Sequence, residues 1–130
     1  MNIALSGRTV LIVEDEMIFG WLLKDILTDL GCIVIGPAAR VDEALRMIET
    51  AKILDIVVLD INLHRQRSYP VADALIARGI PFVFSTGYNK YSLPEIYKNF
   101  AMLQKPFKSQ ELADALMKLL AGEEKRLTGQ

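Results

Sequence analysis

Residues 55–60 read Asp-Ile-Val-Val-Leu-Asp, and this run gives the clearest indication of the fold. Its four central residues are all apolar, which is typical of a parallel strand that is buried on both faces. Asp60 then places a carboxylate at the carboxyl end of that strand. Four other apolar runs of strand length alternate with segments of helical period. This alternation predicts an α/β fold in which a parallel sheet carries helices on both faces.

The expected elements alternate from one end of the chain to the other. We expect strands over 9–14, 33–35, 55–60, 81–85 and 101–104, and helices over 16–30, 41–50, 70–78, 92–99 and 109–121. Gly31 and Gly79 lie where left-handed helix caps are expected, and Gly36-Pro37 is expected to stop the second strand. Ser92 and Glu95 match a capping box that opens the short fourth helix. In the first helix, four-residue spacing predicts an inward stripe of Ile18, Leu22, Ile26 and Leu30, widened by Trp21 and Leu27.

Five strands with five helices fit the flavodoxin-like, doubly wound order 2-1-3-4-5. In this order the first and third strands are neighbours at the point where the winding reverses. Because the carboxyl ends of parallel strands lie at one edge, Asp15 and Asp60 are expected to come close enough to share a cation. Ligands of open α/β sheets bind at this edge.

Length and charge narrow the functional classes. A chain of 130 residues fits one domain over 1–130, with its core at about 8–121 and a polar tail at 123–130. Fifteen basic and sixteen acidic side chains give a net charge of −1, which argues against nucleic acid or an anionic membrane as the main partner. The start of the chain lacks the pattern of a secretory signal, so we expect a cytoplasmic protein. A single Cys32, expected to be buried, and a single His64 exclude a cysteine or multi-histidine metal site.

Polar groups follow four of the expected strands. They are Glu14 and Asp15, Asp60, Thr86, and Lys105. Carboxylates are preferred ligands of Mg²⁺, and a divalent ion would relieve the repulsion among them. A carboxylate can also attack phosphorus, while a lysine and a hydroxyl stabilise the phosphoryl oxygens. The competing interpretation is that each group is an ordinary cap or turn residue, and for Glu14-Asp15 alone the two interpretations weigh about equally.

Four motifs together resemble the receiver domains of two-component response regulators. They lie at residues 11–16, 57–63, 85–87 and 104–107 and read Leu-Ile-Val-Glu-Asp-Glu, Val-Val-Leu-Asp-Ile-Asn-Leu, Ser-Thr-Gly and Gln-Lys-Pro-Phe. The resemblance implies that Asp60 accepts a phosphoryl group and that Thr86 and Lys105 contact it. It also implies that Mg²⁺ is held by Glu14, Asp15, Asp60 and the backbone carbonyl of Asn62. A cis peptide bond between Lys105 and Pro106 is expected on the same ground.

The chain departs from the family pattern at three places. Met102 stands where the family usually has its switch aromatic, and Tyr88, Tyr91 and Phe100 are candidates to replace it, although ordinary packing is the favoured role for each. The loop over 63–70 lacks the usual turn. Its Arg65 and Arg67 are candidates for attracting a phosphodonor, although a solvated loop is the favoured reading. Phe-Ser-Thr-Gly-Tyr at 84–88 is similar to the variant motif of an atypical subgroup associated with bacterial stress signalling.

The leading hypothesis is therefore a phosphoacceptor receiver, stand-alone or kinase-associated, that catalyses only its own phosphorylation and dephosphorylation. The donor would be a sensor histidine kinase or a histidine phosphotransfer protein, and phosphorylation would change contacts with a downstream protein or a second copy of the chain. Two alternatives stay open, a kinase-linked fragment acting as a phosphate sink and an interaction domain that works without phosphorylation. An Asp-nucleophile phosphohydrolase is disfavoured, because Asn62 stands where such enzymes have a second, proton-donating Asp.

Overall fold

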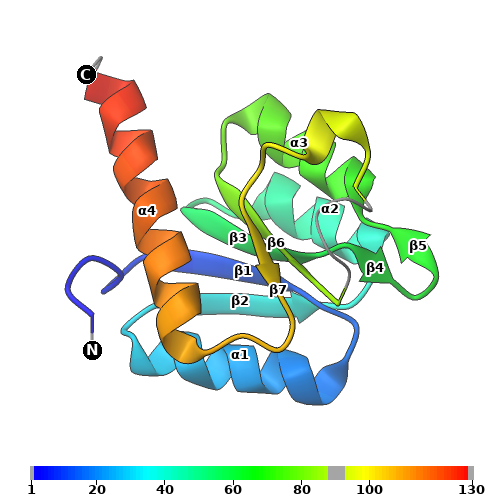
Figure 1. Cartoon of the computed structure of the whole chain (residues 1–130), viewed down its shortest axis with the longest axis horizontal. Coiled ribbons are helices and arrows are strands. Elements are labelled where there is room, and N and C mark those ends of the chain that lie inside the picture. Colours follow the sequence, from blue (N-terminus) through cyan, green and yellow to red (C-terminus); the bar gives the residue numbers. More distant parts are fainter. Residues whose placement is uncertain (1, 88–92, 129–130) are drawn as a thin grey trace.

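A five-stranded parallel sheet forms the centre of the molecule in a computed structural model that describes residues 2–87 and 93–128. Its strands are β1 (Thr9–Val13), β2 (Ile33–Ala38), β3 (Ile56–Asp60), β6 (Phe82–Thr86) and β7 (Met102–Gln104). Their order is β2-β1-β3-β6-β7, so the expected order 2-1-3-4-5 is confirmed (Figure 1). β1 and β3 are direct neighbours, which brings their carboxyl ends together.

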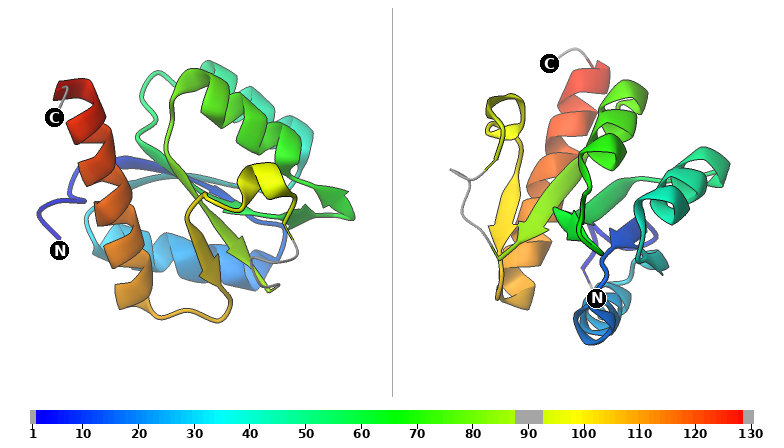
Figure 2. Two further views of the ribbon diagram at one scale, coloured as in Figure 1. Left: turned by 45° about the horizontal axis from the view of Figure 1, so that its top comes forward. Right: turned by 90° about the vertical axis from the view of Figure 1, so that its right-hand side faces the viewer.

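In the part of the chain that the structure describes, four α-helices cover the sheet, two on each face. They are α1 (Met17–Asp29), α2 (Val41–Thr50), α3 (Tyr69–Arg78) and α4 (Ser109–Thr128). Leu23 of α1 and Leu116 of α4 belong to one buried cluster, whereas Ile48 of α2 and Leu75 of α3 belong to the other. Figures 1 and 2 show the two pairs of helices on opposite sides of the strands. The sheet therefore separates two apolar cores and is buried on both faces, as the continuous apolar strands predict.

The expected fourth helix is much shorter than predicted. Within the described residues 93–99, a 3-10 helix over Glu95–Tyr97 forms in place of an α-helix, with Pro94 at its N-cap, so the prediction of an α-helix over 92–99 is wrong. Pro94 has no backbone N–H to donate, and its ring restricts the backbone conformation of the residue before it. Ser92, the other half of the expected capping box, lies outside the described residues.

The second strand is longer than expected, because it runs through Gly36-Pro37 to Ala38. Its register against β1 shifts between Leu11 and Val13, and Gly36 has a φ of 90° there. A left-handed residue at a bulge suits glycine. Beyond the irregularity the pairing resumes, and the backbone N–H of Glu14 donates to the carbonyl of Ala38.

The segment after β3 is a small hairpin rather than an irregular loop. β4 (Asn62–Leu63) pairs with β5 (Gln66–Arg67) in antiparallel fashion, and His64 and Arg65 form the turn with φ values of 46° and 68°. Two consecutive positive φ values are the signature of a tight hairpin turn, which usually carries Asn or Gly. The sequence therefore held no ordinary turn signal at these positions.

The inward face of α1 was predicted only in part, since Leu27 is buried and Ile26 and Leu30 pack against the same core. Ile18, Trp21 and Leu22 are 82%, 58% and 52% exposed, whereas Leu23 and Leu27 are buried. Gly20 explains the difference, since a Cβ at this position would lie 2.9 Å from Cγ of Pro37. The face of α1 that carries Gly20 is thus the one packed against β2.

Other local predictions are confirmed. Gly31 and Gly79 have positive φ values after α1 and α3, Cys32 is buried, and the peptide bond between Lys105 and Pro106 is cis. The last helix instead extends beyond its expected end at residue 121 and takes in most of the segment predicted as a polar tail. In the described part of the chain, none of the helices has the length and apolar character needed to cross a membrane.

Candidate functional site

Three carboxylates meet at the carboxyl edge of the sheet. Glu14 and Asp15 follow β1, and Asp60 ends the neighbouring β3. One oxygen from each lies within 4.8 Å of the others. The predicted proximity of Asp15 and Asp60 therefore follows from the pairing of β1 with β3.

Lys105 reaches this cluster from the end of β7. Its Nζ lies 2.8 Å from Oε1 of Glu14 and 3.2 Å from Oδ2 of Asp60. The backbone N–H of Lys105 donates a 2.7 Å hydrogen bond to the carbonyl of Thr86, which ties β7 to the end of β6. The ring of Phe19 lies 4.5 Å from the same ammonium group, a distance at which a cation–π contact contributes.

Burial and the neighbouring charges shift the pKa values of Glu14 and Lys105. Glu14 is 2% exposed, and this burial, helped by the nearby Asp60, raises the pKa of Glu14 to about 8. Burial by itself would lower the pKa of Lys105, but its hydrogen bond to Glu14 and the charge of Asp60 outweigh that effect and raise it. The site thus holds its lysine charged and holds one carboxyl that takes up a proton near neutral pH.

Backbone N–H groups donate hydrogen bonds to all three carboxylates. Asp15 accepts a 3.0 Å hydrogen bond from the backbone N–H of His64, in the hairpin turn. Glu14 accepts one of 3.1 Å from the N–H of Glu16. The side chain of Glu16 lies 3.7 Å from Lys105 and lines the site, a role that sequence reasoning missed. Its position in the Glu-Asp-Glu run at 14–16 was the available signal.

Asn62 borders Asp60 on the hairpin side. Its backbone N–H donates a 3.2 Å hydrogen bond to Oδ1 of Asp60. Its side-chain oxygen accepts a hydrogen bond from the guanidinium group of Arg67, across the β4–β5 pair. The hairpin therefore touches both Asp60 and Asp15.

These groups surround an open cleft of about 320 Å³. The residues that line it are Asp15, Glu16, Asp60, Asn62, Gly87 and Lys105. Thr86 immediately precedes Gly87 in the chain and is buried. Of the residues predicted from the sequence, the structure gathers Asp15, Asp60, Asn62 and Lys105 on the cleft wall. Glu14 and Thr86 are buried and are not among the described residues that line the cleft.

The donor set fits a hard divalent cation. Three carboxylates supply oxygen ligands, which Mg²⁺ prefers, and the open cleft leaves room for water and a phosphate oxygen. Glu14 and Asp60 already contact one positive charge, the ammonium group of Lys105, which is consistent with a site that favours cations.

Comparison with known proteins identifies this arrangement. The family model described as the response regulator receiver domain matches residues 10–117. The chain belongs to this family. The receiver resemblance read from the four sequence motifs is therefore confirmed, as is the fold class.

Relatives of this receiver differ in how much of their own length matches this chain. The transcriptional regulatory protein PdtaR from Mycobacterium tuberculosis is 30% identical over 113 residues, which are 84% of this chain and 55% of PdtaR. The chain thus spans about half the length of this curated relative. The solution structure of SdrG from Sphingomonas melonis is 42% identical, with a TM-score of 0.77, and the match covers 90% of this chain and 98% of that one.

Two further structures show the fold with the ligands expected in such a site. An SdrG structure described as the BeF3-activated conformation is 39% identical, with a TM-score of 0.74 over 88% of this chain and 98% of its own. The receiver domain of a sensor histidine kinase from Pseudomonas aeruginosa has magnesium coordinated in its active-site cleft. It is 23% identical, with a TM-score of 0.74 over 89% of this chain and 99% of its own, so this likeness shows the fold alone.

Several aromatic rings pack together near Met102, the position at which this receiver departs from the family pattern. Met102 is half-buried and pairs in register with Phe84. Tyr97, which sequence reasoning missed, stacks on Tyr69 at 4.7 Å and meets Phe84 edge-on at 5.9 Å. Of the three predicted candidates, Phe100 packs against Phe82 at 5.1 Å, and Tyr88 and Tyr91 lie outside the described residues.

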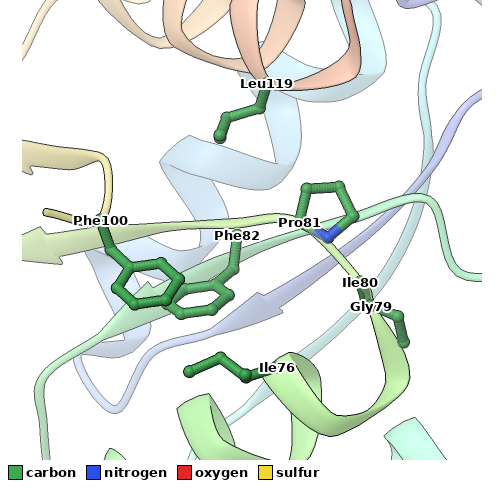
Figure 3. Close-up of a pocket in the computed structure, with 7 residues that line it drawn as sticks. All are labelled: Ile76, Gly79, Ile80, Pro81, Phe82, Phe100 and Leu119. Carbon is green, nitrogen blue, oxygen red and sulfur yellow. The ribbon is translucent and has the colours of Figure 1, made fainter. Parts of the chain in front are cut away.

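A second hollow, of about 290 Å³, lies away from the acidic cleft, at the start of β6 (Figure 3). Figure 3 shows the rings of Phe82 and Phe100 side by side, with Ile76 of α3 and Leu119 of α4 on either side of them. The side chains that line it are all apolar. It therefore offers no group for phosphoryl chemistry.

Proposed function

We propose that this receiver accepts a phosphoryl group on Asp60 from a phosphohistidine of a sensor histidine kinase or histidine phosphotransfer protein, with Mg²⁺ bound. The observation that carries the proposal is the position of Asp60. Its carboxylate ends a buried central strand, lines an open cleft, and lies beside the Lys105 ammonium and two further carboxylates.

The transfer reaction uses groups of the chain itself. An oxygen of Asp60 attacks the phosphorus, the phosphorus–nitrogen bond breaks, and its electron pair returns to the imidazole ring, which takes up a proton. As Asp60 becomes phosphorylated, the ammonium group of Lys105 can leave the Asp60 carboxylate and bind a phosphoryl oxygen. Thr86 is proposed to contact another phosphoryl oxygen from the end of β6. Such transfer depends mainly on positioning and on charge stabilisation.

Glu14, Asp15, Asp60 and the backbone carbonyl of Asn62 would hold the cation. When bound, Mg²⁺ supplies positive charge to the transferring phosphoryl oxygens. The three carboxylates whose oxygens lie within 4.8 Å of one another support this part of the proposal. The beryllofluoride-activated conformation of SdrG, in turn, supports a response of this receiver to a phosphoryl group.

The consequence of phosphorylation is proposed to be a change in protein–protein contacts. The receiver would catalyse only its own phosphorylation and dephosphorylation in the cytoplasm, without acting on a separate substrate. The transcriptional role in the name of PdtaR is not carried over, because the match covers only 55% of that protein.

The test is phosphate uptake from acetyl phosphate in the presence of Mg²⁺, followed by intact-protein mass and by the acid lability of the modification. The parent chain should take up one phosphate and Asp60→Asn should take up none. Asp25→Asn, an exposed carboxylate on α1, is the matched control and should behave as the parent. Equal uptake by Asp60→Asn and the parent would show that Asp60 is not the acceptor.

A further inference from the structure

The β4–β5 hairpin is attached to the acidic cleft at two points. The N–H of Asn62 donates to Asp60, and the N–H of His64 donates to Asp15. Asn62 and Arg67 are direct cross-strand partners, so their side chains lie on the same face of the hairpin. The guanidinium group of Arg67 donates a hydrogen bond to Oδ1 of Asn62.

This contact decides which end of the Asn62 amide is available to a ligand. Among the described residues that line the cleft, Asn62 is the one with an uncharged amide side chain. A carboxamide has an oxygen that accepts and a nitrogen that donates hydrogen bonds. Because arginine is a donor only, the oxygen of Asn62 must face Arg67, and the nitrogen is left on the other side of the planar group.

We propose that Arg67 is a positioning residue that prolongs the life of phosphorylated Asp60 by keeping the oxygen of the Asn62 amide turned away from the cleft. The proposal rests on the function proposed above. It assigns to Arg67 a role that differs from attraction of a phosphodonor.

Hydrolysis of the phosphorylated carboxylate requires a water molecule that loses a proton. The oxygen of water attacks phosphorus, the bond from phosphorus to the Asp60 oxygen breaks, and its electron pair returns to the carboxylate. The proton of the water passes to the released phosphate or to solvent. A hydrogen-bond acceptor beside the water would orient it for attack, whereas an N–H donor binds a phosphoryl oxygen instead. Arg67 thus holds Asn62 in the orientation in which its amide nitrogen can bind a phosphoryl oxygen and its amide oxygen does not orient the attacking water.

The experiment measures loss of phosphate from protein that has already been labelled with acetyl phosphate and Mg²⁺. Arg67→Met keeps the aliphatic stem but removes the donors, and it should lose phosphate about two- to tenfold faster, the change expected from one hydrogen bond of ordinary strength. Arg67→Lys keeps a donor and should stay closer to the parent rate. The rate of phosphate uptake should change much less than the rate of loss.

Two controls separate this role from charge and from folding. Arg65→Met removes the same charge from the same hairpin, without this contact to Asn62, and should leave the rate of loss unchanged. In an Asn62→Ala background, Arg67→Met should have no further effect, because the amide it positions is gone. If Arg67→Met loses phosphate at the parent rate, or accelerates loss equally without Asn62, the inference is wrong. A chain that takes up no phosphate at all contradicts the proposed function instead, since loss is timed only on labelled protein.

Discussion

Lys105 and Glu14 form a buried ion pair in which the ammonium nitrogen lies 2.8 Å from a carboxylate oxygen. The same nitrogen lies 3.2 Å from Asp60, so one ammonium group contacts two of the three carboxylates at the sheet edge. The receiver therefore supplies its own counter-charge to the site, and a cation that enters must share these oxygens with Lys105.

Replacing Lys105 should impair both stability and phosphate uptake. Lys105→Met leaves two carboxylates close together, which should lower the free energy of unfolding of the metal-free chain by about 1–3 kcal/mol. Uptake of phosphate from acetyl phosphate should fall about a hundredfold, as when one stabilising donor is removed from an active site. Urea unfolding and labelling rates measure the two effects. Lys108→Met, an exposed change three residues away, is the control, and a parent-like Lys105→Met would contradict the role given to the ammonium group.

Cation binding should depend on pH through Glu14. Because the pKa of Glu14 is raised to about 8, Mg²⁺ must displace a proton at lower pH. The apparent affinity should rise about tenfold per pH unit below this pKa and level off above it. Trp21, the single tryptophan, borders a hollow shared with Glu14 and Asp15, so its fluorescence can follow the titration. Glu14→Gln should flatten the pH dependence, and an equally steep slope in that variant would assign the proton to another group.

The carboxyl group of Glu14 should also make the metal-free chain less stable as the solution becomes alkaline. The folded-state pKa of Glu14 lies above the ordinary value of 4.5 for a glutamate carboxyl group. Its contribution to stability is therefore fully present below pH 4.5 and is lost as the pH rises through about 8. Thermal unfolding of parent and Glu14→Gln across this range measures the difference, which should narrow when Mg²⁺ is added.

Tyr97 should stabilise the segment that replaces the fourth helix. Its hydroxyl donates a 2.6 Å hydrogen bond to Asp73 of α3, and burial together with this bond raises the pKa of Tyr97 to about 12. Tyr97→Phe should lower the free energy of unfolding by about 0.5–1.5 kcal/mol at neutral pH. Since the folded pKa lies above the ordinary value of 10, the parent should lose this advantage between pH 10 and 12. Denaturant titrations at pH 7 and 11 test this, and a constant difference would contradict it.

Gly36 should not tolerate a side chain. Its φ of 90° is unfavourable for other residues, and an added Cβ would lie 2.7 Å from the carbonyl oxygen of Ile12. Gly36→Ala should therefore destabilise the chain by about 1–3 kcal/mol. Gly87→Ala, where an added Cβ meets nothing within 4 Å, is the control for thermal unfolding. Equal melting temperatures for the two variants would show that the bulge in β2 can relax.

The sheet was predictable because its strands carry continuous apolar runs, and their order followed from the number of strands. The clustering of Asp15, Asp60 and Lys105 followed in turn, since parallel strands end at one edge. Site residues that depend on a backbone turn were harder to predict. His64 meets Asp15 only because two non-glycine residues adopt positive φ values, and no local sequence pattern indicates that.

The face of α1 and the role of Tyr97 escaped prediction for a different reason. The start of α1 is apolar on several sides, so periodicity alone could not choose between Ile18 and Leu23. The glycine in its fourth position, packed against Pro37, held the better signal. Tyr97 owes its importance to Asp73, which lies 24 residues earlier in the chain, and such a pair has no local signature.

The division of the interior into two cores has a consequence for how this receiver can evolve. Among the described residues, the core under α1 and α4 and the core under α2 and α3 form separate clusters on opposite faces of the sheet. Substitutions on opposite faces share few neighbours, so their costs should add rather than compound. A lineage could therefore remodel the side that carries the aromatic segment around Tyr97 for a new partner, while the other side continues to keep the domain folded.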